Sequence, residues 1–269
     1  MSKNEQTTKT AKKAPAPNYR YIDIASLDVD RGYQRDLDDR IVNHIVGNYN
    51  PELMHPVDVV SRGNCKYYAL DGQHRIAAHR ALGLDKVYCR ILPSRTESDE
   101  ARLFLGLNGD LDGKRHAVAA FSKFRARLKA NEPIALEIAD VVKRAGLRLT
   151  PHKASHGVTA VQALEWVHTR HTNLERTLMI LTMWQDGDAG AYDNGFIRHV
   201  SGFLAVHEDA VDSQTVSVLR EVSTEELKKK IKATKADFGG TLSEAATRTI
   251  RALYNARCKG RMRRLKVQG

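Results

Sequence analysis

The sequence predicts an α+β protein in which a small mixed α/β domain is followed by an all-α helical portion. Short apolar segments alternate with helical ones as far as Pro93, and from Ser98 onward apolar residues recur at helical spacing. The first residues are polar and end in Ala-Pro-Ala-Pro. We therefore expect a disordered arm over residues 1–18, the α/β domain over residues 19–110 and the helical portion over residues 111–269.

Four strands and two helices are expected in the α/β domain. The β-branched, aromatic and alternating segments predict strands over residues 19–24, 57–60, 65–70 and 86–92. Arg62-Gly63-Asn64 is typical of a tight hairpin turn between the second and third of these. Apolar residues from Leu37 to Val46 predict a helix that ends before Asn50-Pro51. A second helix is expected over residues 73–82, with Gly83 just past its end.

Nine helical segments follow from Ser98, separated by glycines and prolines. We expect them over residues 98–107, 115–130, 134–145, 158–170, 173–185, 194–207, 213–221, 224–234 and 243–257. The segment 132–149 ends in Ala145-Gly146 and is compatible with a helix-turn-helix, although the following LRLTPHKASHGV is long for the usual turn.

The composition favours a polyanionic partner. The 269 residues carry a formal net charge of +11 and a pI near 9.6, which favour nucleic acid or an acidic surface. No apolar run approaches the roughly 18 residues that span a membrane, and the N-terminus lacks a secretory signal. The three cysteines include no C-x-x-C pair, which argues against a zinc site or disulfide framework and for a cytoplasmic location.

Basic residues cluster in two segments without acidic neighbours, over residues 114–129 and from Arg251 to the C-terminus. The alternative interpretation of such a segment is a solvated basic face. The candidate DNA-binding residues are Lys114, Arg115, Lys123, Arg125, Arg127, Lys129, Arg261, Arg263 and Arg264.

The segment ALDGQHRIAAHRAL (69–82) has the chemistry of an anion site. A strand runs into Asp71-Gly72 and a helix begins, so first-turn N–H groups and the positive end of the helix dipole face the turn. Arg75 can form a bidentate pair with phosphate oxygens. In the alternative interpretation Asp71 caps the helix, Gly72 is a turn residue and Arg75 is a surface charge. Spacing alone leaves both open.

This segment resembles the G-x-x-R-x-x-A signature of ParB-like partition proteins and of the ParB/sulfiredoxin fold. Upstream, SLDVDRGYQRDLDD (26–39) resembles the ParB box in which a Gln-Arg pair precedes a helix. The resemblance covers about residues 20–110. It implies that Gly72, Gln73, His74 and Arg75 cradle the phosphates of a nucleoside triphosphate, CTP or ATP, and that Gln34 and Arg35 lie beside it.

The chain departs from the ParB pattern at the metal. Those proteins hold Mg²⁺ with a Glu-Asn pair, whereas ARLFLGLNGD supplies Asn108 without an adjacent glutamate. Glu97 and Glu100, earlier on the same helix, are the expected partial substitutes, and Glu100 and Asn108 are taken as the candidate metal ligands. Sulfiredoxin has a reactive cysteine where Gln73 stands, so thiol chemistry is excluded.

The resemblance implies a ParB-like DNA-binding protein with a nucleotide pocket, acting in phage or plasmid DNA maintenance or regulation. Duplex DNA is the expected partner, a homodimer is left open, and the expected location is the nucleoid or phage DNA. The alternatives are a metal-dependent nuclease of ParB type or a small-molecule kinase of the same fold. In those alternatives Asp71 and Arg75 are the catalytic candidates.

Overall fold

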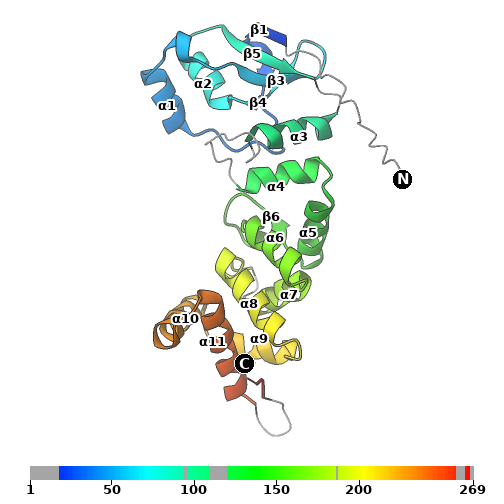
Figure 1. The fold of residues 1–269 in the computed structure, drawn as a ribbon, viewed down its shortest axis with the longest axis vertical. Helices are drawn as coiled ribbons and strands as arrows, with labels where there is room; N and C mark the ends of the chain where they lie inside the picture. The colour runs from blue at the N-terminus through cyan, green and yellow to red at the C-terminus, as the bar shows by residue number, and fades with distance from the viewer. Residues whose placement is uncertain (1–17, 94–95, 109–119, 186, 259–263, 267–269) are drawn as a thin grey trace, which may run out of the picture. The chain divides into compact units, whose positions relative to one another are not determined.

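The computed structural model describes all residues except 1–17, 94–95, 109–119, 186, 259–263 and 267–269. The chain divides into two compact units, residues 1–118 and 119–269 (Figure 1). The expected arm over residues 1–18 lies outside the described residues apart from Asn18, which begins a strand. The expected boundary at residue 110 also lies outside them.

The first unit is a mixed α/β domain, as the sequence predicts (Figure 1). Its strands are β1 (Asn18–Asp23), β2 (Leu27–Asp28), β3 (Val57–Ser61), β4 (Tyr67–Asp71) and β5 (Lys86–Leu92). They form one sheet in the order β1-β5-β3-β4-β2. Strands β1 and β5 and strands β3 and β4 pair antiparallel, whereas β3 and β5 and β2 and β4 pair parallel. The expected hairpin is confirmed at β3 and β4.

The described part of this unit contains the α-helices α1 (Asp39–Gly47), α2 (Gln73–Ala81) and α3 (Glu97–Asn108). It also contains two short 3₁₀ helices, η1 (Ile24–Ser26) and η2 (Pro51–Leu53). Helix α2 packs on β3 and β5, and α3 packs on β4. Ile76 of α2 lies in a buried core with Val57, Val59 and Cys89. Because β3 is central, four consecutive residues from Val57 to Val60 are buried, and the charged one among them, Asp58, is paired with Arg90.

The hairpin turn is longer than the sequence indicates. Gly63, Asn64 and Cys65 all have positive φ, so three consecutive residues adopt left-handed backbone before β4 begins at Tyr67. Strand β2 was not expected, because two residues carry no periodicity. It forms through its pairing with β4.

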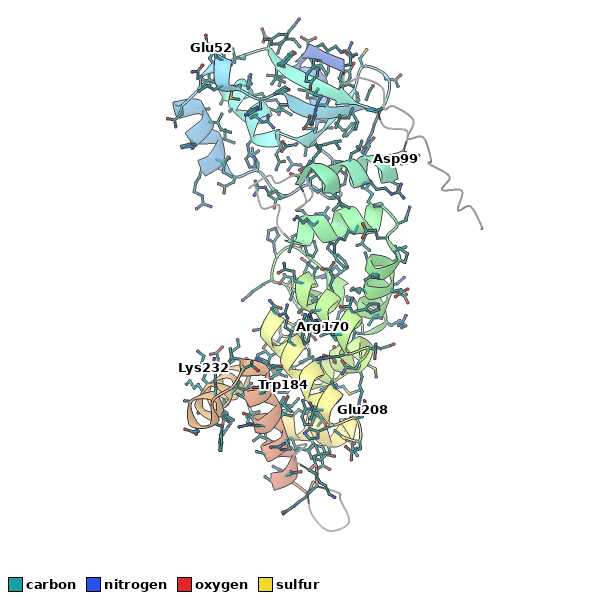
Figure 2. The ribbon with its side chains drawn as sticks, viewed as in Figure 1. Glu52, Asp99, Arg170, Trp184, Glu208 and Lys232 are labelled. Atoms are coloured by element: carbon teal, nitrogen blue, oxygen red, sulfur yellow. The ribbon has the colours of Figure 1, made fainter. Side chains whose placement is uncertain are left out.

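The second unit is helical. Its helices are α4 (Ala120–Lys129), α5 (Pro133–Arg144), α6 (Val161–Arg170), α7 (Leu174–Trp184), α8 (Asn194–Val206), α9 (Asp212–Leu219), α10 (Thr224–Phe238) and α11 (Leu242–Ala256). One contiguous apolar core joins them. Trp184, labelled in Figure 2, is buried in it and donates a hydrogen bond from Nε1 to the Val222 carbonyl at 3.2 Å. No helix in the described ranges is long and apolar enough to cross a membrane.

Two details of the helical unit differ from expectation. Strands β6 (Arg148–Leu149) and β7 (Gly157–Val158) pair in parallel in the stretch considered for a helix-turn-helix. That interpretation is therefore wrong, because a two-stranded ladder fills the interval between α5 and α6. The start of the helix expected over residues 115–130 lies outside the described residues, and its described part is α4.

Candidate functional site

A cavity of about 740 Å³ lies in the α/β unit where β4 ends and α2 begins. This volume is within the range of ligand pockets, roughly 300–1,000 Å³. The side chains lining it come from segments far apart in the sequence. All six predicted nucleotide-binding residues are among them, together with Asp71 and Asn108: Gln34, Arg35, Gly72, Gln73, His74 and Arg75.

Gly72 determines the geometry of the turn. Its φ of 100° lies in the left-handed region, and it precedes α2 without any side-chain cap for the first-turn N–H groups. A Cβ at this position would lie 2.9 Å from Nη2 of Arg75. The turn thus requires glycine at position 72 for two reasons. The backbone is left-handed there, and the Arg75 guanidinium lies where a Cβ would be. The uncapped N–H groups of the first turn are the classical donors for an anion.

Arg75 is already engaged by the protein. Its Nη1 donates hydrogen bonds to the carbonyl oxygens of His55 (2.6 Å) and Pro56 (2.7 Å), and its Nη2 pairs with Asp71 Oδ2 at 2.9 Å. The guanidinium therefore ties the 55–56 segment to the end of β4. Both terminal nitrogens thus have protein partners, which gives Arg75 a positioning role, and its expected role as the bidentate phosphate ligand stays a prediction. The Asp71 carboxylate is held by the same ion pair.

Arg35 is the cavity arginine without such a tie. The guanidinium is half-buried, lines the cavity, and makes no ion pair or hydrogen bond with the described part of the chain. Arg75 is paired with Asp71, and Arg90 pairs with the buried Asp58 at 2.5 Å. The cavity lining thus contains three arginines and two aspartates. With the histidines neutral, the cavity has a net charge of +1, and the arginine without a carboxylate partner is Arg35.

Two glutamine side chains join the upstream box to the α2 turn. Gln34 donates from Nε2 to the carbonyls of Ala69 and Leu70, each at 3.0 Å. Gln73 donates from Nε2 to the Arg35 carbonyl at 3.2 Å. The Gln73 side chain is 7% exposed, and its Oε1 has no hydrogen-bond partner among the described residues. A buried acceptor without a donor is costly, so this atom favours a ligand or water with an N–H or O–H group.

His74 has a positioning role. Its Nε2 accepts a hydrogen bond from the backbone N–H of Asp38 at 3.1 Å. Asp38 in turn caps helix α1 by accepting from the Arg40 N–H. The imidazole is 9% exposed and bridges α2 to the start of α1. His74 thus holds the cavity wall formed by α1.

The predicted metal pair is not brought together. Asn108 lines the cavity and donates to the Phe104 carbonyl at 3.0 Å. Glu100 does not line it; its carboxylate is buried against Arg62 at 2.6 Å. The two residues are eight positions apart on α3, about 12 Å along a helix axis. No group of three His, Cys, Asp or Glu side chains in the described ranges could hold a metal ion. The Mg²⁺ site predicted on Glu100 and Asn108 therefore does not fit this chain.

The predicted DNA-binding residues are partly described. Lys114, Arg115, Arg261 and Arg263 lie outside the described residues, whereas Arg264 is exposed. Lys123, Arg125, Arg127 and Lys129 lie on α4, where Phe124 is the core residue. Arg127 is paired with Glu165 and Glu132, which reduces its availability for phosphate.

The helix expected over residues 224–234 is confirmed as α10, but the sequence analysis did not identify its basic surface. Five lysines lie on it, and the exposed ones are Lys229, Lys230, Lys232 and Lys235. Its buried residues are Leu227 and Ile231, so a narrow stripe holds the helix and most of its surface is open. Lys232 is labelled on this helix in Figure 2. The run KKKIKATK carried the signal, but the glutamates before it excluded it from a search for acid-free segments.

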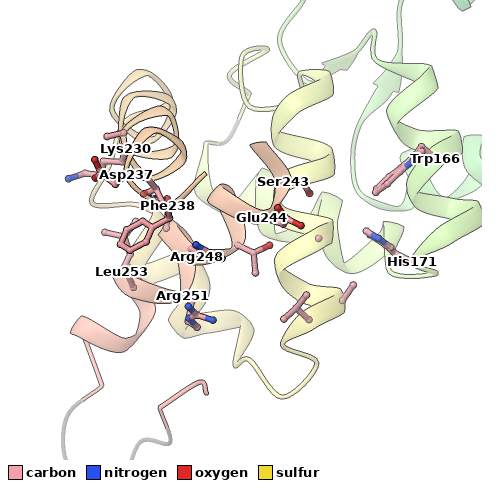
Figure 3. A pocket seen from close by; sticks show the side chains of 18 residues that line it. Trp166, His171, Lys230, Asp237, Phe238, Ser243, Glu244, Arg248, Arg251 and Leu253 are labelled. Carbon is pink, nitrogen blue, oxygen red and sulfur yellow. Dashed lines mark hydrogen bonds between the residues drawn. The ribbon is translucent and has the colours of Figure 1, made fainter. Parts of the chain in front are cut away.

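A second cavity, of about 1,000 Å³, lies in the helical unit beside α8, α10 and α11 (Figure 3). Its cations are Lys230, Arg248 and Arg251, and its anions are Asp237 and Glu244. The guanidinium of Arg248 lies 5.7 Å from the ring centre of Phe238, which is largely exposed. The cavity is therefore amphipathic, with a slight excess of positive charge.

A comparison of the sequence with protein families identifies the family of this chain. The model of a family of unknown function, DUF6551, matches residues 29–267, and the chain belongs to this family. No curated protein matches the sequence.

Three solved structures are remotely similar. Sulfiredoxin from Arabidopsis thaliana is 26% identical, over 33% of this chain and 98% of that chain, with a TM-score of 0.28. C-terminally truncated ParB from Caulobacter crescentus, complexed with CTP-γ-S, is 14% identical, over 76% of this chain and 98% of that chain, with a TM-score of 0.30. A Pnob8-like ParB-N domain is 15% identical, over 90% of this chain and 96% of that chain, with a TM-score of 0.30.

Proposed function

We propose that this protein binds a nucleotide in the α/β unit and duplex DNA through the helical unit, in the maintenance or regulation of phage or plasmid DNA. One observation carries the nucleotide proposal. The Gln34-Arg35 box and the Gly72–Arg75 turn, more than 35 residues apart, line one cavity of ligand size. In this cavity the uncapped start of α2 and the untied Arg35 guanidinium supply positive charge for phosphates.

The roles of the cavity residues follow from their contacts. Arg35 and the first-turn N–H groups of α2 bind phosphate oxygens. Arg75, His74 and Gln34 are positioning residues, because their side chains already hold the surrounding segments. Gln73 Oε1 accepts from an N–H or O–H group of the ligand. No Mg²⁺ ligand is assigned, and catalysis by Asp71 stays a prediction.

Calorimetric titration with CTP, ATP and ADP tests this proposal. We expect wild-type protein to bind at least one of them, and Arg35→Ala to weaken binding by about tenfold or more, since a hydrogen bond to a charged group contributes roughly 1.5–3 kcal/mol. Arg40→Ala is the matched control, because this arginine lies on α1, is 92% exposed and does not line the cavity. Absence of binding to all three nucleotides, or equal losses in both variants, would contradict the proposal.

The DNA proposal is supported by charge. The chain carries +11, and the exposed lysines of α10 add to the cations of α4 and to Arg264. If six to ten phosphates are contacted, affinity for duplex DNA should fall by roughly 10³–10⁵ between about 50 and 200 mM salt. Fluorescence anisotropy over a salt series measures this. The triple variant Lys229→Gln/Lys232→Gln/Lys235→Gln should have a shallower slope, and Lys143→Gln, an exposed lysine of α5, is the control. A salt-insensitive affinity would sink the DNA proposal.

A further inference from the structure

Three tyrosines form an exposed aromatic surface at one end of the sheet. Tyr19 and Tyr21 lie on edge strand β1, and Tyr88 lies on its neighbour β5. The side chains are 45%, 69% and 39% exposed, respectively. We call these three residues the tyrosine platform.

The pairing register explains why the three rings share a face. Tyr21 lies opposite Tyr88 in the antiparallel β1–β5 ladder, and Tyr19 is two residues from Tyr21. Side chains alternate between faces, so the platform lies opposite the buried Ile22, Val87 and Cys89. Those three residues belong to the core that contains Ile76 of α2.

The rings are arranged for stacking. Tyr19 and Tyr88 are stacked with centroids 5.9 Å apart and planes inclined by 23°. Tyr21 and Tyr88 have centroids 5.2 Å apart and planes tilted by 45° to each other. Each ring is therefore held by a neighbour while a large part of it remains open. At the other end of the sheet, by contrast, the Tyr68 ring is covered by the Arg62 guanidinium at 3.9 Å.

The platform is continuous with the candidate nucleotide cavity. Tyr19 lines the cavity, and it interacts with Arg90, another cavity residue. Arg90 and Lys86 flank Tyr88 at alternate positions of β5, so cations and aromatic rings interleave on one face. Arg90 is balanced by Asp58 and Lys86 by Asp23, so the net positive charge that can attract a phosphate is that of Arg35 in the cavity.

We propose that unpaired bases of a nucleic-acid strand stack on the tyrosine platform while a phosphate of the same strand enters the adjoining cavity. Every base has a π-face, so such a surface binds single strands with little sequence preference. The placement of the phosphate rests on the proposed nucleotide function, whereas stacking of the bases does not. The partner is thus a single strand or a strand end, distinct from the duplex assigned to the helical unit.

Fluorescence anisotropy with three probes of equal length tests the proposal: an oligothymidine of about ten nucleotides, an abasic strand with the same phosphates, and a duplex. The full-length wild-type protein should bind the oligothymidine more tightly than the abasic strand. Tyr21→Thr and Tyr88→Thr should each weaken binding to oligothymidine by roughly 5- to 150-fold, the loss of one stacked base. Their affinity for the abasic strand and for mononucleotide should stay unchanged, because neither tyrosine lines the cavity.

The phenylalanine variants are the matched controls. Tyr21→Phe and Tyr88→Phe keep the aromatic ring and should retain wild-type affinity for oligothymidine. Threonine is used to remove the ring because it still favours β-strand backbone, so β1 and β5 should be retained. Equal wild-type affinities for oligothymidine and abasic strand would overturn the proposal without any variant. A wild-type dimer that the threonine variants dissociate in sedimentation velocity would also overturn it, since the face would then join two copies. Base-dependent binding without mononucleotide binding would support the platform and remove the proposed nucleotide function instead.

Discussion

Replacing Arg62 by methionine is expected to lower the free energy of unfolding of the protein by about 3–5 kcal/mol, the usual cost of removing one partner from a buried ion pair. Arg62, at the start of the β3–β4 turn, pairs with Glu100 and Asp30, each at 2.6 Å. The Glu100 side chain is only 4% exposed, so methionine would leave a buried carboxylate without its counter-charge.

The same network explains the charge state of Arg62. Burial by itself would lower the pKa of the guanidinium, but the hydrogen bonds to Glu100 and Asp30 outweigh it and raise the pKa above its usual range. Arg62 is therefore positively charged at every ordinary pH. Its stacking on the Tyr68 ring helps to hold the guanidinium in place.

Urea unfolding followed by circular dichroism measures the effect. Arg102→Met is the matched control on the same helix as Glu100, because its pair with Asp99 is largely exposed. That variant should lose no more than about 1 kcal/mol. Equal losses in the two variants would show that the buried network does not stabilise this unit.

Replacing Gly72 by alanine is expected to destabilise the protein and to abolish nucleotide binding together. A left-handed backbone at a non-glycine residue costs about 1–3 kcal/mol, and Gly72 has a φ of 100°. The added Cβ would also displace the Arg75 guanidinium, which lies within 3.1 Å of that position. Arg75 would then lose its hold on Asp71 and on the 55–56 segment.

Gly83→Ala separates the two causes. Gly83 also has a positive φ, 70°, but a Cβ there would meet nothing within 4 Å. Gly83→Ala should therefore lower the stability of the fold by the cost of the left-handed backbone alone, and its nucleotide affinity should equal that of the wild type. Thermal unfolding and calorimetric titration of both variants measure these effects. If Gly72→Ala bound nucleotide like wild type, the close packing of Arg75 on Gly72 would have no functional consequence.

The order of elements could be predicted from the sequence because most of them carry their own periodicity. Strand β5 was predicted at its observed bounds, and the helix at Gln73 within one residue at its end. Strands β2, β6 and β7 could not be predicted, because each has two residues and exists only through its partner strand. Local patterns do not encode such pairings.

The location of the candidate site could also be predicted, but its internal contacts could not. The GxxR turn and the Gln-Arg pair indicated which residues meet in the cavity. Arg75 and Arg35 have the same charge in the sequence, and only the fold places the 55–56 carbonyls and Asp71 around Arg75. Glu100 could not be assigned either, because its partner Arg62 is 38 residues away. Tertiary contacts decide which charges remain available to a ligand.

The central claim is that the turn from Gly72 to Arg75 binds the phosphates of a nucleotide. Amide hydrogen exchange of the full-length protein, with and without the nucleotide that binds in calorimetry, tests it most directly. The predicted result is slower exchange of the amides of Gln73 and Arg75 at the start of α2, with little change at the start of α1, where the Asp38 side chain already caps the first turn. Slower exchange elsewhere, with the start of α2 unchanged under saturating nucleotide, would contradict the claim.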